Sequence, residues 1–196
     1  FPCACSRKQL GGELHLGVCP APADHDFAWR FLCPGGVTTL HDGLQPDHRY
    51  DLADEIGDFV IRRRDGFWSY QLAVVVDDAA QEITHVVRGI DLIDSTVRQY
   101  LLQQALSLSV PQYSHIPVAV EQNGQKLSKQ NLALPLSDQR ISETLWQALH
   151  WLRQSPPQTL FGAPADELLN WAVSQWNPVS LKGEKSMPAP GPFQRT

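Results

Sequence analysis

Three cysteines and a histidine lie close together near the start of the chain. They follow the spacing Cys3-x-Cys5 and then His15-x-x-x-Cys19. Thiolates and imidazole are the usual ligands of tetrahedral zinc, and four protein ligands would close such a site. The spacing therefore predicts a structural metal site and not a catalytic one. Two alternatives stay open at this point: Cys33 could replace His15 as the fourth ligand, or some of the thiols are free.

The stretch Lys126-Leu127-Ser128-Lys129-Gln130 carries two lysines three residues apart, with a serine between them. It follows the turn signal Asn123-Gly124, so we expect it on an exposed loop. Two fixed positive charges and a hydroxyl suit a polyphosphate that gains charge as it leaves. Taken alone the pattern is weak, and a solvated loop is the simpler interpretation.

Arg88 directly follows an expected strand over residues 83–87. In open α/β sheets, ligands bind at the carboxyl ends of the strands. The planar guanidinium group can pair with both oxygens of a carboxylate, which makes Arg88 a candidate binding residue. The alternative is an ordinary arginine at the end of a strand, held in a surface ion pair.

The elements that must position these residues are expected to be both strands and helices. Apolar runs and turn pairs predict five strands, over residues 28–32, 59–64, 71–76, 83–87 and 116–120. Asp65-Gly66 predicts a hairpin turn, and Asp77-Asp78 is expected to end the buried strand 71–76.

Helical spacing of apolar residues appears in three places. A helix over residues 97–108 is expected to be capped by Asp94-Ser95-Thr96 and stopped by Pro111. A second helix contains Leu145, Trp146, Leu149 and Leu152 and begins after Ser137 or Ser142, and a third covers residues 165–176. Residues 177–196, rich in Pro, Gly, Ser and Lys, are expected to be a disordered tail.

Composition limits the classes of function. The chain has 196 residues, of which 42% are hydrophobic and 19% charged, which fits one large domain or one domain with an appendage. The net charge of −5 gives no overall basic surface, so contact with nucleic acid would need local patches. No apolar run is long enough to cross a bilayer, and we expect no membrane partner. The first residue is Phe1, which suggests the later part of a longer chain.

Four blocks in this order resemble the class I glutamyl-tRNA synthetases: Tyr70–Asp78, His85–Leu92, Ser95–Gln99 and Lys126–Gln130. The last block looks like the Lys-Met-Ser-Lys-Ser loop of that family and departs from it at Leu127 and Gln130. The segment with the cysteines fits the family's zinc-binding insertion. Too few residues follow the loop for anticodon-binding domains. The resemblance therefore narrows to a truncated branch, the glutamyl-queuosine tRNA(Asp) synthetase family.

The resemblance implies an α/β fold, namely the second half of a class I synthetase Rossmann-type nucleotide-binding fold. It adds a zinc-binding insertion and a C-terminal helical region. The implied parts are residues 1–58, 59–131, 132–176 and the tail 177–196. The family's first half, with its His-Ile-Gly-His-type motif, is not present in this sequence. We therefore expect the chain to be incomplete and not fully active alone.

The resemblance also implies an activity. A member of this family would activate L-glutamate with ATP, with Mg²⁺, and transfer the glutamyl group to queuosine in the anticodon loop of tRNA(Asp). Tyr70 and Arg88 match its glutamate-binding residues, and Lys129 matches the catalytic, ATP-binding lysine. Cys3, Cys5 and Cys19 match zinc ligands, and His15 stands where relatives carry tyrosine. A cytoplasmic monomer with structural Zn²⁺ is the expected form.

Two other interpretations remain. One is a fragment of a discriminating glutamyl-tRNA synthetase, against which the Pro-rich tail argues. The other is a zinc-stabilised RNA-binding module without catalysis, which the acidic net charge and the lack of an aromatic-basic motif weaken.

Overall fold

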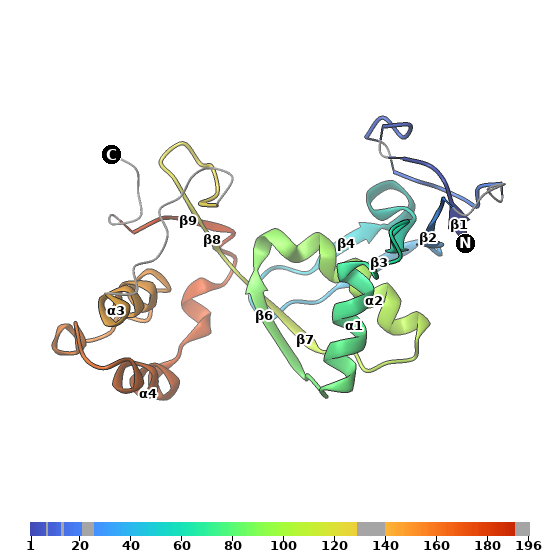
Figure 1. Ribbon diagram of the computed structural model, residues 1–196. Helices are drawn as coiled ribbons and strands as arrows, with labels where there is room; N and C mark the ends of the chain where they lie inside the picture. Colours follow the sequence, from blue (N-terminus) through green and yellow to red (C-terminus); the bar gives the residue numbers. More distant parts are fainter. Residues whose placement is uncertain (7, 13, 21–25, 129–139, 191–196) are drawn as a thin grey trace. The chain divides into compact units, whose positions relative to one another are not determined.

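The computed structural model describes residues 1–6, 8–12, 14–20, 26–128 and 140–190. The chain divides into two compact units, Phe1–Ser114 and His115–Thr196, and each is described by itself. Figure 1 shows the element order along the chain. The division into four parts that we expect from the sequence remains a prediction. Its last part, the tail, differs from the expectation, because η4 and β9 lie within it.

The first unit begins with a three-stranded antiparallel sheet in the order β1-β2-β5. Its strands are β1 (Pro2–Cys3), β2 (Ala28–Phe31) and β5 (Phe59–Arg62). Cys3 pairs with Ala28, and Phe31 pairs with Phe59, with an irregularity in register between Trp29 and Arg30. The strands expected over residues 28–32 and 59–64 are thus confirmed, within one or two residues at their ends.

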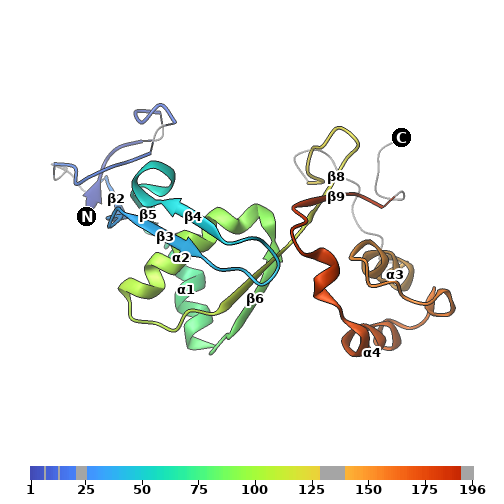
Figure 2. The ribbon, with the colours of Figure 1, turned by 180° about the vertical axis from the view of Figure 1, so that it is seen from behind.

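A β-hairpin and a short helical turn follow β2. The strands β3 (Val37–Leu40) and β4 (His48–Asp51) pair antiparallel, and the π-helical turn η1 (Leu52–Ile56) comes directly after them. The carboxylate of Asp51 accepts the N–H of Ala53 at 3.1 Å and so caps this turn. The hairpin lies against α2 (Figure 2), and buried residues from both form one core with Val75 and Phe59.

The segment expected as a buried strand over residues 71–76 is instead part of a helix, α1 (Tyr70–Ala80). The side chain of Ser69 caps it by accepting the N–H of Leu72 at 3.5 Å. Apolar residues recur here at Leu72, Val75 and Ala79, which is helical spacing, and Val75 is fully buried. The three consecutive valines hide this period in the sequence. Asp77 and Asp78 therefore lie within a helix and do not end a strand.

The strand expected over residues 83–87 forms two residues later, as β6 (His85–Gly89), so that Arg88 lies inside it. The 3₁₀ turn η2 (Ile90–Leu92) leads to α2 (Ile93–Ala105), which packs against α1 (Figure 1). β6 is hydrogen-bonded to β7 (Gln112–Ile116), which begins after Pro111.

The cap expected at Asp94-Ser95-Thr96 is wrong, because α2 already begins at Ile93 and has no side-chain cap. Thr96 instead donates its hydroxyl to the carbonyl of Leu92 at 3.3 Å and is fully buried. The helix also ends at Ala105, before the expected residue 108. The polar side chains of this first turn contact other elements and do not cap the N-terminus of the helix.

The second unit joins two short strands and two main helices. Its elements are β8 (Val118–Val120), α3 (Ile141–Trp151), η3 (Gln158–Leu160), α4 (Ala165–Gln175), η4 (Pro178–Leu181) and β9 (Ser186–Pro188). β8 and β9 pair in parallel. Leu149, Leu168 and Ala172 form the core between α3 and α4.

Three expectations for this unit change. Pro117, which has no N–H to donate, separates β7 from β8, so the strand expected over residues 116–120 is divided. Ser142 lies within α3 and does not cap it, and Ser137 lies outside the described residues. The tail is ordered up to residue 190, because Leu181, Met187 and Ala189 are buried. The helix over residues 165–176 is confirmed.

Among the described residues, none of the helices combines the length and the apolar character that crossing a membrane requires.

Candidate functional site

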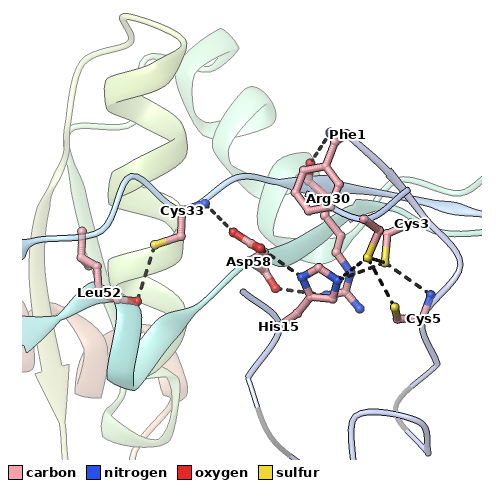
Figure 3. Close-up of polar contacts among 9 residues, drawn as sticks. Phe1, Cys3, Cys5, His15, Arg30, Cys33, Leu52 and Asp58 are labelled. Atoms are coloured by element: carbon pink, nitrogen blue, oxygen red, sulfur yellow. Dashed lines mark hydrogen bonds and ion pairs between the residues drawn. The ribbon is translucent and has the colours of Figure 1, made fainter. Parts of the chain in front are cut away.

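The four residues proposed as metal ligands meet at one point of the first unit. One ligand atom from each of Cys3, Cys5, His15 and Cys19 lies within 4.8 Å of the others. His15 Nε2 is 3.2 Å from Cys3 Sγ and 3.1 Å from Cys19 Sγ, and Cys5 Sγ is 3.5 Å from Cys19 Sγ. Figure 3 shows the sulfur atoms gathered on one side of the imidazole ring.

These distances suit a tetrahedral ion. With Zn–S bonds of ~2.3 Å, two sulfur ligands are separated by about 3.8 Å, close to the spacing found here. Cys3 and His15 are buried, as expected of a closed site. Cys33 is not among the grouped ligands, since its thiol lies 3.6 Å from the carbonyl oxygen of Leu52. Of the two sequence alternatives for the fourth ligand, the geometry favours His15.

Local backbone structure holds the cluster together. Pairing of β1 with β2 fixes Cys3 opposite Ala28. The backbone N–H of Asp58 donates to the carbonyl oxygen of His15 at 2.7 Å, which ties the ligand loop to β5. Gly57 allows this approach: its φ is +62°, and a Cβ there would lie 2.9 Å from the same oxygen.

The thiols have strongly different acidities before any metal binds. Burial alone would raise the pKa of Cys3, but hydrogen bonds from the Cys5 backbone and from Arg30 outweigh it and lower that pKa to about 6. Burial and hydrogen bonds with Cys5 and Cys3 raise the pKa of Cys19 to about 12. The metal-free cluster therefore favours a thiolate at Cys3 and a protonated thiol at Cys19, and a bound cation would displace the proton of Cys19.

A second polar group surrounds Arg88. Its guanidinium donates to Thr96 Oγ1 at 2.5 Å and to Gln99 Oε1 at 2.8 Å, and both partners are buried. Gln99 in turn donates to Gln71 Oε1 at 2.9 Å, and Gln71 donates to Ser95 Oγ at 3.0 Å. Thr96 and Gln99 carry no charge, so they orient the guanidinium group without neutralising it.

Two tyrosines belong to the same neighbourhood. The guanidinium carbon of Arg88 lies 5.3 Å from the ring centre of Tyr113. Burial raises the pKa of Tyr113, and the charges of Arg88 and Tyr70 both act on it. Tyr70 is the first residue of α1 and is half exposed. A cation held in this way beside phenol groups can bind a carboxylate.

A cavity of about 860 Å³ lies in the first unit. Tyr70 and Gln71 line it together with Arg63 and Arg98, and it extends to His15 of the metal cluster. The cavity is therefore rich in arginine, and its lining includes the predicted binding residue Tyr70. Arg88 does not line this cavity.

The lysine stretch belongs to the second unit and is described only in part. The N–H of Leu127 donates to the carbonyl of Ala119 at 2.9 Å, and Lys126 is exposed opposite Val120. The expected turn at Asn123-Gly124 is present, with the Gly124 N–H donating to Glu121 at 2.9 Å. Ser128 is partly buried, and Lys129 and Gln130 lie outside the described residues.

Two contributions to these sites were missed from sequence. Asp58 contacts the metal cluster from 43 residues away, and Gln99 holds Arg88 from the middle of a helix. Nothing in the spacing around either residue signals these contacts, because both depend on how distant elements pack.

Comparison with known proteins adds independent information. Residues 23–150 match the family described as tRNA synthetases class I (E and Q), catalytic domain. The chain is 45% identical over 183 residues to a glutamyl-Q tRNA(Asp) synthetase of Methylococcus capsulatus, covering 90% of this chain and 61% of that protein. It is 44% identical over 203 residues to the protein of the same description from Thiobacillus denitrificans, covering 98% and 67%. The chain thus spans only about two thirds of the length of these relatives.

Solved structures show the same fold. A glutamate tRNA ligase from Elizabethkingia meningosepticum, in complex with its amino acid, superposes with a TM-score of 0.64 at 18% identity. The match covers 84% of this chain and 36% of the ligase. Glutamate-tRNA synthetase from Elizabethkingia anophelis gives a TM-score of 0.62 at 21% identity, covering 84% and 37%.

Proposed function

The chain belongs to the family of class I tRNA synthetase catalytic domains (E and Q), and we propose on this basis that it serves as part of a glutamyl-queuosine tRNA(Asp) synthetase. The relatives of that description, at 45% and 44% identity, support this assignment. The proposed reaction has two steps. A carboxylate oxygen of L-glutamate attacks the α-phosphorus of ATP and releases pyrophosphate. A hydroxyl of queuosine in tRNA(Asp) then attacks the glutamyl carbonyl and releases AMP.

The observation that carries the proposal is the placement of Arg88. Its guanidinium is oriented by two neutral acceptors, Thr96 and Gln99, beside Tyr113. In the proposed mechanism Arg88 pairs with a glutamate carboxylate, and Tyr70 hydrogen-bonds to the amino acid and shapes its pocket. These contacts hold glutamate against ATP and so lower the entropic part of the barrier.

Lys129 is proposed to act in the first step. A lysine ammonium near the leaving pyrophosphate stabilises the charge that develops there. This role rests on the sequence of the loop Lys126–Gln130 and on its likeness to the signature loop of the family. Mg²⁺ is the proposed companion of ATP, because it neutralises the phosphate charge.

Zinc is the proposed occupant of the cluster formed by Cys3, Cys5, His15 and Cys19. Three sulfur ligands and one nitrogen ligand, in a group of which Cys3 and His15 are buried, favour zinc over the hard cations. The ion would cross-link the N-terminal segment to itself between residues 3 and 19, and this segment is joined to β2 by strand pairing and to the start of β5 by the Asp58 N–H bond to His15. We assign it a structural role, because all four coordination positions are filled by the protein.

We also propose that the protein is located in the cytoplasm and that its active form is a monomer. Both follow from the proposed tRNA substrate and the expectations drawn from the sequence.

The proposal is tested by glutamate-dependent exchange between ATP and pyrophosphate in the absence of tRNA. The chain is assayed alone and after extension by the part of the Thiobacillus denitrificans relative that it does not span. Exchange in the extended protein supports the proposal, and glutamate transferred to queuosine-containing tRNA(Asp) completes it. Acylation of tRNA(Glu) at its 3′ end would instead indicate a glutamyl-tRNA synthetase. Binding of tRNA without any exchange would indicate a non-catalytic module.

A further inference from the structure

Asp58 makes two side-chain contacts at the edge of the metal cluster. Its Oδ2 lies 3.0 Å from His15 Nδ1, and its Oδ1 accepts the backbone N–H of Cys33 at 2.8 Å. The side chains of His15 and Asp58 are only 4% and 2% exposed. Figure 3 shows the imidazole ring between the carboxylate on one side and the cysteine sulfur atoms on the other.

This arrangement defines which nitrogen of His15 is available to a metal ion. A carboxylate accepts hydrogen bonds, so the proton of the neutral imidazole lies on Nδ1. Nε2 then presents its lone pair to the point between Cys3 and Cys19, from whose sulfur atoms it is 3.2 and 3.1 Å away. Without the carboxylate, the ring would be free to hold its proton on Nε2, where it blocks coordination.

Asp58 is itself fixed in place by its surroundings. Its backbone N–H donates to the carbonyl oxygen of His15, and its own carbonyl accepts the buried guanidinium of Arg30 at 3.0 Å. Arg30 also hydrogen-bonds to Cys3. This guanidinium supplies positive charge beside a carboxylate and a thiolate that are both buried, which offsets part of the cost of burying them.

We propose that Asp58 is a positioning residue for the metal: it selects the tautomer of His15 and fixes the direction of Nε2. The inference rests on the metal site of the proposed function and adds a residue that the family's ligand set does not contain. It also explains how a histidine can serve at a position where the resemblance implies a tyrosine.

The test compares Asp58→Asn with a matched control, Asp47→Asn. Asp47 Oδ2 lies 2.8 Å from His41 Nδ1, the same pairing of atoms, but the side chain of Asp47 is 58% exposed and that of His41 is 78% exposed. An asparagine at position 58 cannot accept from both His15 Nδ1–H and the Cys33 N–H, because it has only one acceptor oxygen. If that oxygen keeps the Cys33 N–H, the amide NH2 faces His15 Nδ1 and favours the tautomer with the proton on Nε2. Zinc affinity is measured by competition with a chromophoric chelator on the full chain. We expect Asp58→Asn to weaken binding roughly 10- to 100-fold, the scale for lost outer-shell partners, and Asp47→Asn to leave it unchanged.

A double-mutant cycle separates positioning from a general structural effect. In a His15→Ala background there is no imidazole to orient, so Asp58→Asn should then change zinc affinity by less than about twofold. An equal loss in both backgrounds would overturn the proposal and assign Asp58 to the fold alone. The Nδ1 proton of His15, followed by NMR in the zinc-bound chain, provides a second readout. We expect it to be protected in the unmodified chain and in Asp47→Asn, and to exchange rapidly in Asp58→Asn.

Two controls keep the outcomes distinct. If Asp58→Asn does not fold, Asp58→Glu retains the carboxylate, and it should recover part of the zinc affinity and the protected Nδ1 proton. Absence of both in a folded Asp58→Glu chain would contradict the proposal. If the unmodified chain binds no zinc, the metal part of the proposed function fails, whatever the ATP–pyrophosphate exchange shows. If it binds zinc and Asp58→Asn binds equally well, only the role of Asp58 fails.

Discussion

The carboxylate of Asp58 lies 3.0 Å from Nδ1 of His15, although 43 residues separate them in the chain. Both side chains are almost completely buried. The contact joins the loop that carries the ligands to the residue directly before β5, next to Phe59 in the core of the first unit. Metal binding and the stability of that unit should therefore depend on each other.

Removal of the metal should lower the stability of the first unit. An ion that binds only the folded chain, at a free concentration 1,000 times its Kd, adds ~4 kcal/mol to the free energy of unfolding. Thermal unfolding with and without a chelator measures the change. Cys33→Ser should keep the full metal dependence, and Cys19→Ser should lose most of it. An unchanged Tm after verified metal loss would contradict the assignment of the cluster.

Gly57→Ala should destabilise the same unit. A Cβ at this position would lie 2.9 Å from both the carbonyl oxygen of His15 and the Cβ of Leu14, on a backbone with φ +62°. We expect a loss of ~2–3 kcal/mol in urea unfolding, combining left-handed strain with a clash. Gly35→Ala is the control, because its φ is +69° and no atom lies within 4 Å. If both variants lose the same amount, the close approach to His15 has no energetic role.

Substitution of Arg88, made in the extended protein of the exchange assay, should strongly reduce glutamate activation while leaving the fold intact. Arg88→Lys keeps the charge but loses the planar fork that can bind two carboxylate oxygens. We expect a drop of roughly 10²–10³-fold in glutamate-dependent ATP–pyrophosphate exchange for Arg88→Ala, and a smaller drop for Arg88→Lys. Arg49→Lys, on the exposed face of β4, is the control and should exchange normally. Normal exchange by Arg88→Ala would remove this residue from the mechanism.

Lys129→Ala should slow formation of the adenylate by roughly 10²–10³-fold, the cost of losing one group that stabilises developing charge. Rapid-quench measurement of pyrophosphate release checks this. Both this variant and its control are made in the extended protein of the exchange assay. Lys182→Ala, an exposed lysine of the second unit, should keep the rate of the unmodified extended protein. An unchanged rate in Lys129→Ala would mean that the loop has a different role.

Ionisation of Tyr50 should lower the free energy of unfolding at alkaline pH. Burial, together with the charges of Asp94 and Glu55, raises the pKa of Tyr50 from 10 to about 12. Below pH 10 both states keep the phenol proton. Between pH 10 and 12 the unfolded chain loses it and the folded chain does not, so stability falls as pH rises. In Tyr50→Phe, the free energy of unfolding measured with urea should decrease less between pH 10 and 12, and its dependence on pH below pH 9 should be unchanged. If the free energy of unfolding decreases equally with pH in both proteins above pH 10, the raised pKa of Tyr50 is contradicted.

The sequence was most informative where residue type limits the chemistry. Cysteines are few, and only a small number of ligand spacings suit zinc, so the spacing grouped Cys3, Cys5 and Cys19 and left His15 and Cys33 as alternatives for the fourth ligand. The geometry was needed to favour His15. Asp58 could not be added to that group, because its contact with His15 depends on the pairing of β5 with β2. No local pattern records such a relationship.

Two errors in secondary structure have a related origin. The valines around Val75 favour a strand by composition, but the Ser69 cap and the packing of Val75 in the core select α1. In the tail, apolar residues are so sparse that composition predicts disorder. Met187 is nevertheless buried, because β9 pairs with β8, a strand nearly 70 residues earlier. Tertiary contacts decided the tail, and the sequence window around it contains none of them. In α1 a tertiary contact, the burial of Val75, acts together with a local signal, the Ser69 cap, that the run of valines obscures.

The order of strands in the first sheet also has a consequence for folding kinetics. Cys3, Cys5 and Cys19 lie within a short loop, so closing it costs little chain entropy and the thiolates can gather an ion early. The contact between His15 and Asp58 must wait until β5 has joined β2, a pairing of much higher contact order. We therefore expect refolding in the presence of metal to pass through a loosely coordinated state that tightens only when the sheet closes.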